Sequence, residues 1–214
     1  MIGWKAAALA ASPVELDLGI EARVFPNKPL DSRQHGSHVS ATLEAEWYRD
    51  FNNGDDRIVI NPYVRVDQGD PERSHGDLRQ LYWRHTVGSV DLYVGVRRIF
   101  WGVTEALHLV DVINQTDFVE NIDGEDRLGQ PMVQVAWQRD WGNVEFFLLP
   151  WFRERTFPGR TGRLRAPLPV LTDTPRNEAS SEQRHLDWAV RYFQVFGPVE
   201  IGLAHFSGTQ REPT

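Results

Sequence analysis

The sequence predicts an all-β fold, an antiparallel meander of about nine strands that makes up part of a barrel. Apolar and polar residues alternate with a period of two through most of the chain, as in strands with one apolar and one polar face. Connections of about two to five residues alternate with connections of roughly nine to thirty-one residues. Short turns therefore fall at one end of the predicted sheet and long loops at the other.

The expected strands follow one another along the chain. They cover residues 14–24, 39–47, 58–66, 77–87, 90–101, 133–138, 144–153, 186–196 and 199–208. The first is the clearest, because its even positions are apolar and its odd positions are polar or glycine. The next two alternate in the same way, and the Asn52-Asn53-Gly54 sequence between them is a strong tight-turn signal.

The later strands are less regular. Residues 77–87 are ambiguous because Leu78 and Tyr82 lie out of phase with Leu81 and Trp83. Residues 144–153 are apolar at nearly every position. Two-residue hairpin turns are predicted at Gly88-Ser89, Gly142-Asn143 and Gly197-Pro198.

Length and composition narrow the class of protein. A chain of 214 residues can form one domain with a sizeable core, and we expect a single domain over residues 14–214 that is incomplete at its C-terminus. Residues 1–13 are expected to form an arm or the remnant of a signal peptide. The absence of cysteine excludes disulfides and thiol chemistry. The formal charge of −7, without a basic face, argues against a nucleic-acid partner.

Residues 101–132 differ from the strand-like runs. This stretch carries seven acidic residues and one arginine, a formal charge of −6. We expect its apolar residues Leu107, Leu109, Val110, Ile113 and Phe118 to dock against the wall, with the carboxylates facing water and Arg97 as the wall partner of one of them. The carboxylates are Glu105, Asp111, Asp117, Glu120, Asp123, Glu125 and Asp126. In a pore they would favour cations.

The sorting of connection lengths is typical of an outer-membrane β-barrel, whose strands are apolar only at alternate positions. Aromatic residues at both ends fit two interfacial girdles. The short-turn end has Trp47, Tyr48, Phe51, Trp141 and Phe196, and the long-loop end has Phe25, Phe100, Trp101, Trp151, Phe152 and Phe206. A soluble β-sandwich also alternates but has no reason to sort its loops by length.

Two adjacent motifs carry a resemblance to a known family. The run Gly95-Val96-Arg97-Arg98-Ile99-Phe100-Trp101-Gly102 is followed by Val110-Asp111-Val112-Ile113-Asn114-Gln115-Thr116-Asp117. These segments resemble a poorly characterised group of Gram-negative outer-membrane porin-like proteins, over most of the chain and most closely over residues 91–151. The long acidic segment is similar in its position, the third outward connection, to the loop that constricts general porins, an analogy of architecture that brings no substrate.

The polar face supplies the candidate lumen wall. The expected pore-lining residues are Glu15, Asp17, Glu21, Arg23, Glu44, Glu46, Arg57, Arg65, Asp67, Asp91 and Arg97. Any one of these charges is expected to pair across the strands, whereas the set could govern ion preference.

Other clusters are weaker signals. The loop carboxylates match no EF-hand spacing, so solvated groups are expected in place of a metal site. Arginines between 153 and 165 could recruit anionic solutes or lipopolysaccharide phosphates, or could simply be solvated. The histidines show no catalytic spacing.

These features predict a porin-like channel in the outer membrane of a Gram-negative bacterium, for passive diffusion of small solutes, with residues 102–131 as the constriction. Its expected partners are outer-membrane lipid, lipopolysaccharide and small solutes, and a homo-oligomer is compatible with the pattern. No enzymatic activity, cofactor or metal is expected. Two alternatives stay open, a non-conducting structural or export-associated outer-membrane barrel and a soluble carbohydrate-binding β-sandwich.

Overall fold

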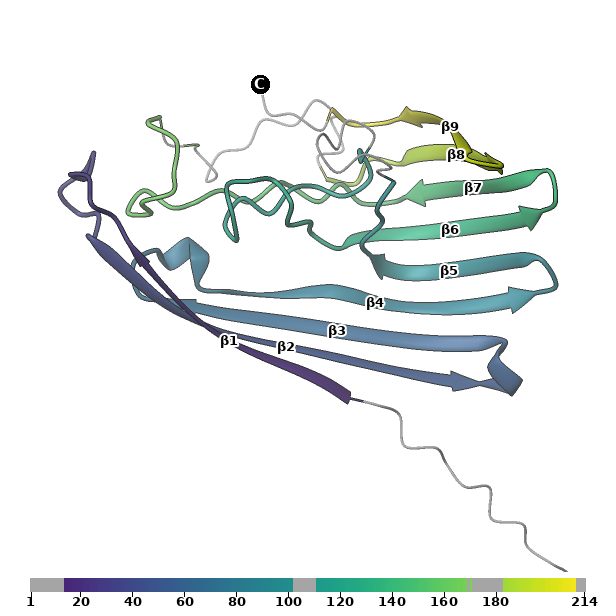
Figure 1. Ribbon diagram of the computed structural model, residues 1–214, viewed down its shortest axis with the longest axis horizontal. Coiled ribbons are helices and arrows are strands. Elements are labelled where there is room, and N and C mark those ends of the chain that lie inside the picture. The colour runs from purple at the N-terminus through teal and green to yellow at the C-terminus, as the bar shows by residue number, and fades with distance from the viewer. Residues whose placement is uncertain (1–13, 102–110, 169, 171–182, 211–214) are drawn as a thin grey trace, which may run out of the picture.

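The computed structural model describes residues 14–101, 111–168, 170 and 183–210. All nine expected strands form, and each pairs antiparallel with the next one along the chain, which confirms the predicted meander. Figure 1 shows them in order from β1 to β9. The strands are β1 Val14–Val24, β2 Ser37–Phe51, β3 Asp56–Asp67, β4 His75–Val87, β5 Val90–Arg97, β6 Gln130–Arg139, β7 Gly142–Leu149, β8 Asp187–Phe196 and β9 Val199–Ser207.

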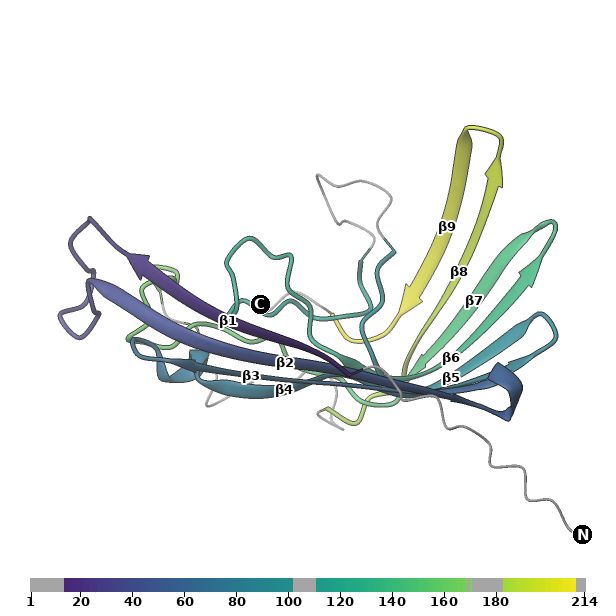
Figure 2. The same cartoon turned by 60° about the horizontal axis from the view of Figure 1, so that its bottom comes forward.

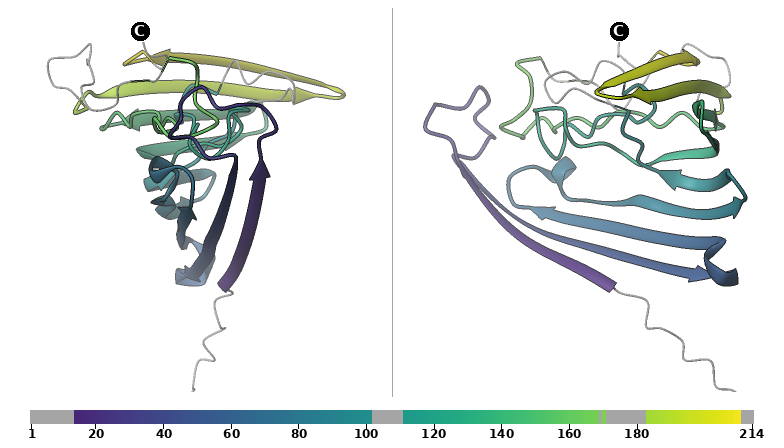
Figure 3. Two further views of the ribbon diagram at one scale, coloured as in Figure 1. Left: turned by 90° about the vertical axis from the view of Figure 1, so that its left-hand side faces the viewer. Right: turned by 45° about the vertical axis from the view of Figure 1, so that its right-hand side comes forward.

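The sheet is curved and open, with β1 and β9 as its two edges (Figures 2 and 3). Two 3-10 turns, η1 (Asn52–Gly54) and η2 (Pro71–Arg73), interrupt the connections. Within the described ranges no helix is long and apolar enough to cross a membrane. The described strands belong to one sheet, so the facing second sheet of a β-sandwich is not present among them.

The two faces of the sheet differ as the alternation predicts. Strand pairing aligns the apolar positions in rows that cross the sheet, for example Leu18 with Leu43 and Leu43 with Val64. On this convex face large apolar side chains stay exposed, with Ile20 at 87% and Leu203 at 65% relative exposure. The concave face carries the polar rows and the long connections.

A β-bulge resolves the ambiguous fourth strand. The pairing of β3 with β4 shifts by one residue between Asn61 and Pro62, so Pro62 pairs with Leu78 while Ile60 pairs with Leu81. The extra residue brings Leu78 and Leu81 onto the same convex face although their spacing is odd. The conflicting periodicity in the sequence is therefore the signature of the bulge.

The turns predicted at residues 52–54, 88–89 and 197–198 form, with the backbone that their residues allow. The turn predicted at Gly142-Asn143 lies two residues earlier, at residues 140–141, because Gly142 already pairs with Arg139. Asn52, Asn53 and Gly54 all have positive φ angles, 49°, 58° and 96°. Asparagine and glycine are the residue types that adopt this region most readily. Gly88 and Gly197, each at φ 59°, close the hairpins β4–β5 and β8–β9.

The aromatic residues follow the expected end placement only in part. Trp141 and Phe196 are exposed near the short turns, and Phe100 and Trp151 are exposed near the long connections. Trp101, however, is buried, and Phe206 packs against the same buried cluster on the concave side. The assignment of Trp101 and Phe206 to a girdle was wrong, because both side chains pack in or against the cluster that contains Ile113.

Candidate functional site

A long segment between β5 and β6 lies on the concave face of the sheet (Figure 2). We call it the inner loop, residues 98–129, of which 98–101 and 111–129 are described. Its second half folds into a small hairpin, in which Thr116 and Arg127 form an isolated antiparallel bridge and the Leu128 N–H donates to the Gln115 carbonyl at 2.9 Å. The described second half of the segment is therefore folded against the sheet and is not a solvated connection.

Asn114 fixes both ends of the inner loop. Its side-chain oxygen accepts from the Ile99 N–H at 2.8 Å, and its amide nitrogen donates to the carbonyls of Arg97 and Leu128, also at 2.8 Å. The side chain is buried and its oxygen and nitrogen both have partners, as a buried amide requires. One asparagine thus joins the end of β5 to the return of the loop toward β6.

The inner loop is anchored to strands β6–β8 of the wall by apolar packing. We call these residues the apolar anchor, and they are Trp101, Ile113, Met132, Phe147, Leu149 and Ala189. Phe147 is completely buried, and its ring lies edge-on to Trp101 with 5.2 Å between centroids. Phe147 and Leu149 take concave positions of β7 and are apolar because they face the loop and not water, whereas Asn143 and Glu145, nearer the short turn, keep that face polar.

The other half of the wall binds the inner loop through buried charges. Arg65 donates to Glu120 from Nη2 at 2.7 Å, and the Tyr63 hydroxyl donates to the same carboxylate at 2.8 Å. Arg73 donates to the carbonyls of Val119 and Glu120 at 3.0 and 3.1 Å. These five residues form the polar anchor of the loop.

Further contacts balance the positive charge of the two arginines in the polar anchor. Arg73 also pairs with Asp67 at 2.9 Å and with Glu21 at 3.1 Å, and the Ser40 hydroxyl accepts from both arginines. Arg73 is only 2% exposed and its pair with Asp67 is shielded from water, whereas Glu21 is about one-third exposed. A buried charge left without a partner is expensive, which explains why the two arginines and the three carboxylates occur together. Farther out, Arg23 Nη2 donates to Asn121 Oδ1 at 2.7 Å.

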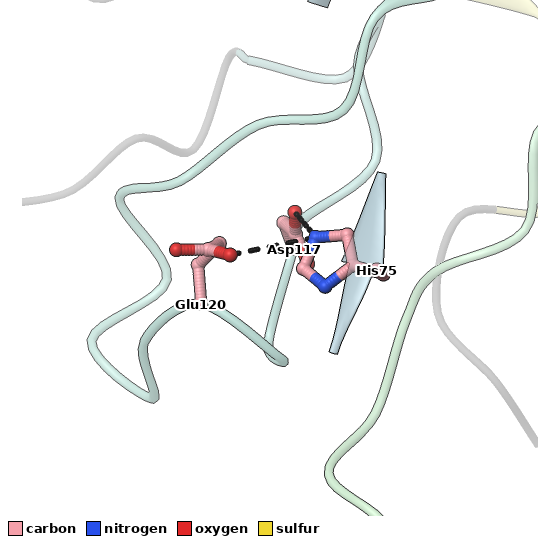
Figure 4. Close-up of side chains that lie close together, drawn as sticks. All are labelled: His75, Asp117 and Glu120. Atoms are coloured by element: carbon pink, nitrogen blue, oxygen red, sulfur yellow. Dashed lines mark ion pairs between the residues drawn. The ribbon is translucent and has the colours of Figure 1, made fainter. Parts of the chain in front are cut away.

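His75, Asp117 and Glu120 meet beside the polar anchor (Figure 4). His75 Nε2 lies 3.4 Å from Glu120 Oε1 and 3.9 Å from Asp117 Oδ2, and the three ligand atoms lie within 4.8 Å of one another. A cation could in principle be held there. Both Glu120 oxygens already accept hydrogen bonds from Arg65, however, so a metal ion would lie against a guanidinium. The geometry therefore fits a contact between wall and loop better than a metal centre.

Asp117 is the carboxylate with the least favourable surroundings in this group. Burial raises its pKa above the ordinary value, and nearby Glu120 adds to that rise, while a hydrogen bond from the Thr156 hydroxyl and the proximity of His75 oppose it. Protonation of Asp117 therefore favours the docked loop.

A second long connection, residues 150–186, packs beside the inner loop; its residues 150–168, 170 and 183–186 are described. Phe118 stacks on Phe157 at 5.9 Å, and Asp117 forms a parallel bridge with Thr156. Arg153 and Arg163 donate to the carbonyls of Gly129 and Asn27. Arginines of this basic stretch are thus used inside the protein, which leaves fewer of them for anionic partners.

The concave face carries every residue predicted for the wall. Registers place Glu15, Asp17, Glu21, Arg23, Glu44, Glu46, Arg57, Arg65, Asp67, Asp91 and Arg97 in its polar rows. Several of them pair, as Arg57 does with Asp50 at 2.6 Å. Three cross-strand pairs nevertheless oppose like charges, Glu15 with Glu46, Asp17 with Glu44, and Arg57 with Arg84.

The predictions for the inner loop are corrected in part. Ile113 is buried and Phe118 is half-buried, whereas Glu105, Leu107, Leu109 and Val110 lie outside the described residues. The carboxylates do not all face water, because Asp117 and Glu120 are buried against the wall, and of the six described carboxylates only Asp123 and Glu125 are exposed. Asp111 and Asp126 are half-buried.

Among the described residues, no loop carboxylate pairs with Arg97. Its guanidinium donates to Gln134 Oε1 and lies over the rings of Tyr93 and Tyr82, while Arg65 binds Glu120. Sequence reasoning missed Arg73, which stands in a polar turn and gives no periodic signal. A hint was available in Asp70-Pro71, because Asp70 caps η2 by accepting from the Glu72 N–H and so fixes the start of the turn that holds Arg73.

Comparisons of the chain with protein-family models, with curated proteins and with solved structures found no match.

Proposed function

We propose that this chain forms part of the wall of a Gram-negative outer-membrane channel through which small solutes diffuse. In this proposal the convex face contacts lipid, the concave face lines the pathway, and the inner loop narrows it. The observation that carries the proposal is the belt of exposed apolar side chains that crosses all nine strands on one face only.

Physical arguments favour lipid as the occupant of the convex face. Large contiguous apolar patches are rare on soluble monomers, whereas a bilayer requires such a surface. The strands have 8 to 15 residues, which brackets the length of about nine to eleven residues that a tilted strand needs to cross the hydrocarbon core. Exposed tryptophans such as Trp83, Trp137 and Trp188 add aromatic surface to this face.

The inner loop supports a role in limiting passage. Two independent anchors, one apolar and one charged, hold it on the face that would enclose the lumen. A connection that served only to join two strands would not need a buried arginine on the wall to bind its backbone. We therefore assign the loop to the constriction.

One observation favours the alternative, a non-conducting structural or export-associated barrel. The inner loop and residues 150–168 contact each other through Phe118 and Phe157 on the concave side, which reduces the space left for solutes. Conductance separates the two functions, because only a channel passes ions.

The direct test is the conductance of the protein in planar lipid bilayers. We expect stable conductance steps from the parent protein and larger steps after deletion of residues 104–126, because that deletion removes the hairpin from the concave face. A variant in which exposed Asp123 is changed to alanine is the matched control, and it should conduct like the parent. Protein that inserts but never conducts would support the structural alternative.

A further inference from the structure

A group of arginine and tyrosine side chains stands on the concave face outside the loop anchors. It consists of Arg57, Arg84, Arg97, Tyr48, Tyr82 and Tyr93 on strands β2 to β5. We infer that these side chains form a binding site for small organic anions that carry a carboxylate. The inference rests on the proposed function in one respect, that water and solutes reach the concave face.

Arg97 is a cation whose described contacts are neutral. Its guanidinium carbon lies 3.8 Å from the Tyr93 ring centre and 4.8 Å from that of Tyr82, and it donates to the side-chain oxygen of Gln134. No carboxylate among the described residues forms an ion pair with it, although it is partly buried. Its Nε is buried with no described acceptor. A guanidinium in such surroundings gains more than an exposed one from an incoming anion.

The side-chain amide of Gln134 is fixed in orientation, and as a neutral group it does not balance the charge of Arg97. Gln134 Nε2 donates to Glu145 at 3.1 Å, and that bond turns the amide oxygen toward Arg97. Glu145 itself pairs with Arg191 at 3.5 Å. The nearby carboxylate is therefore already engaged, and the arginine keeps its charge available.

Arg84 extends the site toward the short turns. It stands directly across the strands from Arg57 on one side and from Tyr93 on the other. Arg57 is paired with Asp50 and stacks on Tyr48 at 4.8 Å, but among the described residues Arg84 donates only to the Gly54 carbonyl, at 3.1 Å. Like charges directly opposite each other destabilise a strand pair, and Asp50 forms its ion pair with Arg57, so an incoming anion beside Arg84 would reduce the remaining repulsion.

The chemistry of these groups selects the class of ligand. A guanidinium binds a carboxylate through two parallel hydrogen bonds, and stacking on an aromatic ring orients its planar face. Tyr93 is flanked by Arg84 and Arg97, so a planar carboxylate can meet charged donors and aromatic surface together. A halide ion would be attracted by the positive charge of the arginines but could not form the two parallel hydrogen bonds that a carboxylate forms.

The test is calorimetric titration of benzoate into the detergent-solubilised protein, with empty micelles as the blank. We expect saturable binding of benzoate and no saturable binding of the neutral analogue benzamide. The double variant Arg84→Gln/Arg97→Gln should bind benzoate roughly tenfold more weakly or not at all. Arg139→Gln removes an exposed arginine near Trp137, outside the arginine–tyrosine group, and should bind like the parent.

Two results would overturn the inference. One is equal binding of benzoate and benzamide by the parent protein, which needs no variant to fold. The other is unchanged benzoate binding in the double variant. Bilayer conductance tests the proposed function separately, since binding without conductance would keep the site and reject the channel, and conductance without binding would do the reverse.

Discussion

The two halves of the concave wall hold the inner loop by different forces. On β6 to β8 the contact is apolar, with Trp101 and Ile113 of the loop packed on Phe147 and its neighbours. On β3 and η2 the contact is a set of charged hydrogen bonds, in which Arg65 and Arg73 bind the stretch around Glu120. One loop therefore combines a contact that tolerates small shifts with one that requires defined donor and acceptor positions.

The difference shows what each anchor contributes. Burial of apolar surface is non-directional, so the apolar anchor supplies stability without setting the exact position of the loop. Charge-assisted hydrogen bonds are directional, so the polar anchor sets the register of residues 119–120 on the wall. Removing a residue from either half should therefore have different consequences for stability and for loop position.

The largest effect is expected at the apolar anchor. Phe147→Ala should lower the free energy of unfolding by about 3 to 5 kcal/mol, because it opens a cavity under Trp101. Denaturant titration of the protein in lipid vesicles would measure it. Phe146→Ala, on the adjacent but exposed position of the same strand, is the matched control and should cost clearly less. Equal losses for both would mean that the loop does not cover this part of the wall.

The polar anchor should respond next most strongly. Glu120→Ala removes the closer of two carboxylates that pair with buried Arg65 and leaves the longer contact with Glu21 at 3.4 Å. We expect a loss of about 3 kcal/mol, the lower end of the range for removing one partner of a buried ion pair. Amide hydrogen exchange of residues 114–128 should rise, because the loop loses its attachment to β3.

The double variant Arg65→Met/Glu120→Leu sharpens this comparison. Replacing both charges by apolar side chains also removes the guanidinium that Glu120→Ala deprives of its closer carboxylate, so stability should recover most of the loss. Asp123→Ala, at an exposed position of the same loop, should change stability by no more than about 0.5 kcal/mol. If amide hydrogen exchange of residues 114–128 were the same in the Asp123→Ala and Glu120→Ala variants, the Glu120 contact would not hold the loop.

The smallest effect is a dependence on pH. Burial raises the pKa of Asp117 in the folded protein, so its contribution to stability is fully present below the unfolded value of 3.8 and is lost as the pH rises through the folded pKa. Asp117→Asn mimics the protonated side chain and can still accept from Thr156. Exchange protection of the inner loop in the variant should exceed that of the parent at neutral pH and equal it near pH 4. Equal protection at both pH values would show that the carboxylate is not strained.

The meander could be predicted from the sequence because the alternation of apolar and polar residues is a local property of each strand. The even positions of β1 and the odd positions of β2 pair as their pattern predicts, Leu18 with Leu43 for example. The bulge in β4 is also visible in the sequence, because the apolar alternation changes phase between Leu78 and Leu81. The apolar contact of Ile113 was also predictable, since an apolar side chain in a polar loop needs cover.

The polar anchor was not predictable, because ion pairs between distant segments leave no periodic trace. Arg65 and Arg97 occupy equivalent positions in the pattern, yet the curvature of the sheet and the path of the loop bring only Arg65 to Glu120. The same geometry buries Asp117, which looked like a solvated carboxylate. Sequence alone could give the sign of these charges but not their partners.

The most direct test of the central claim asks whether the convex face contacts lipid. The chain has no cysteine, so single cysteines can be placed on β1 at Leu16, Leu18 and Ile20 and at Glu15 and Asp17, and labelled with a fluorophore. Reconstitution with nitroxide-labelled lipid should quench the first three sites strongly and the other two weakly, a period of two along the strand. Equal quenching at all five positions, or none at any, would contradict a lipid-facing convex surface and with it the channel wall.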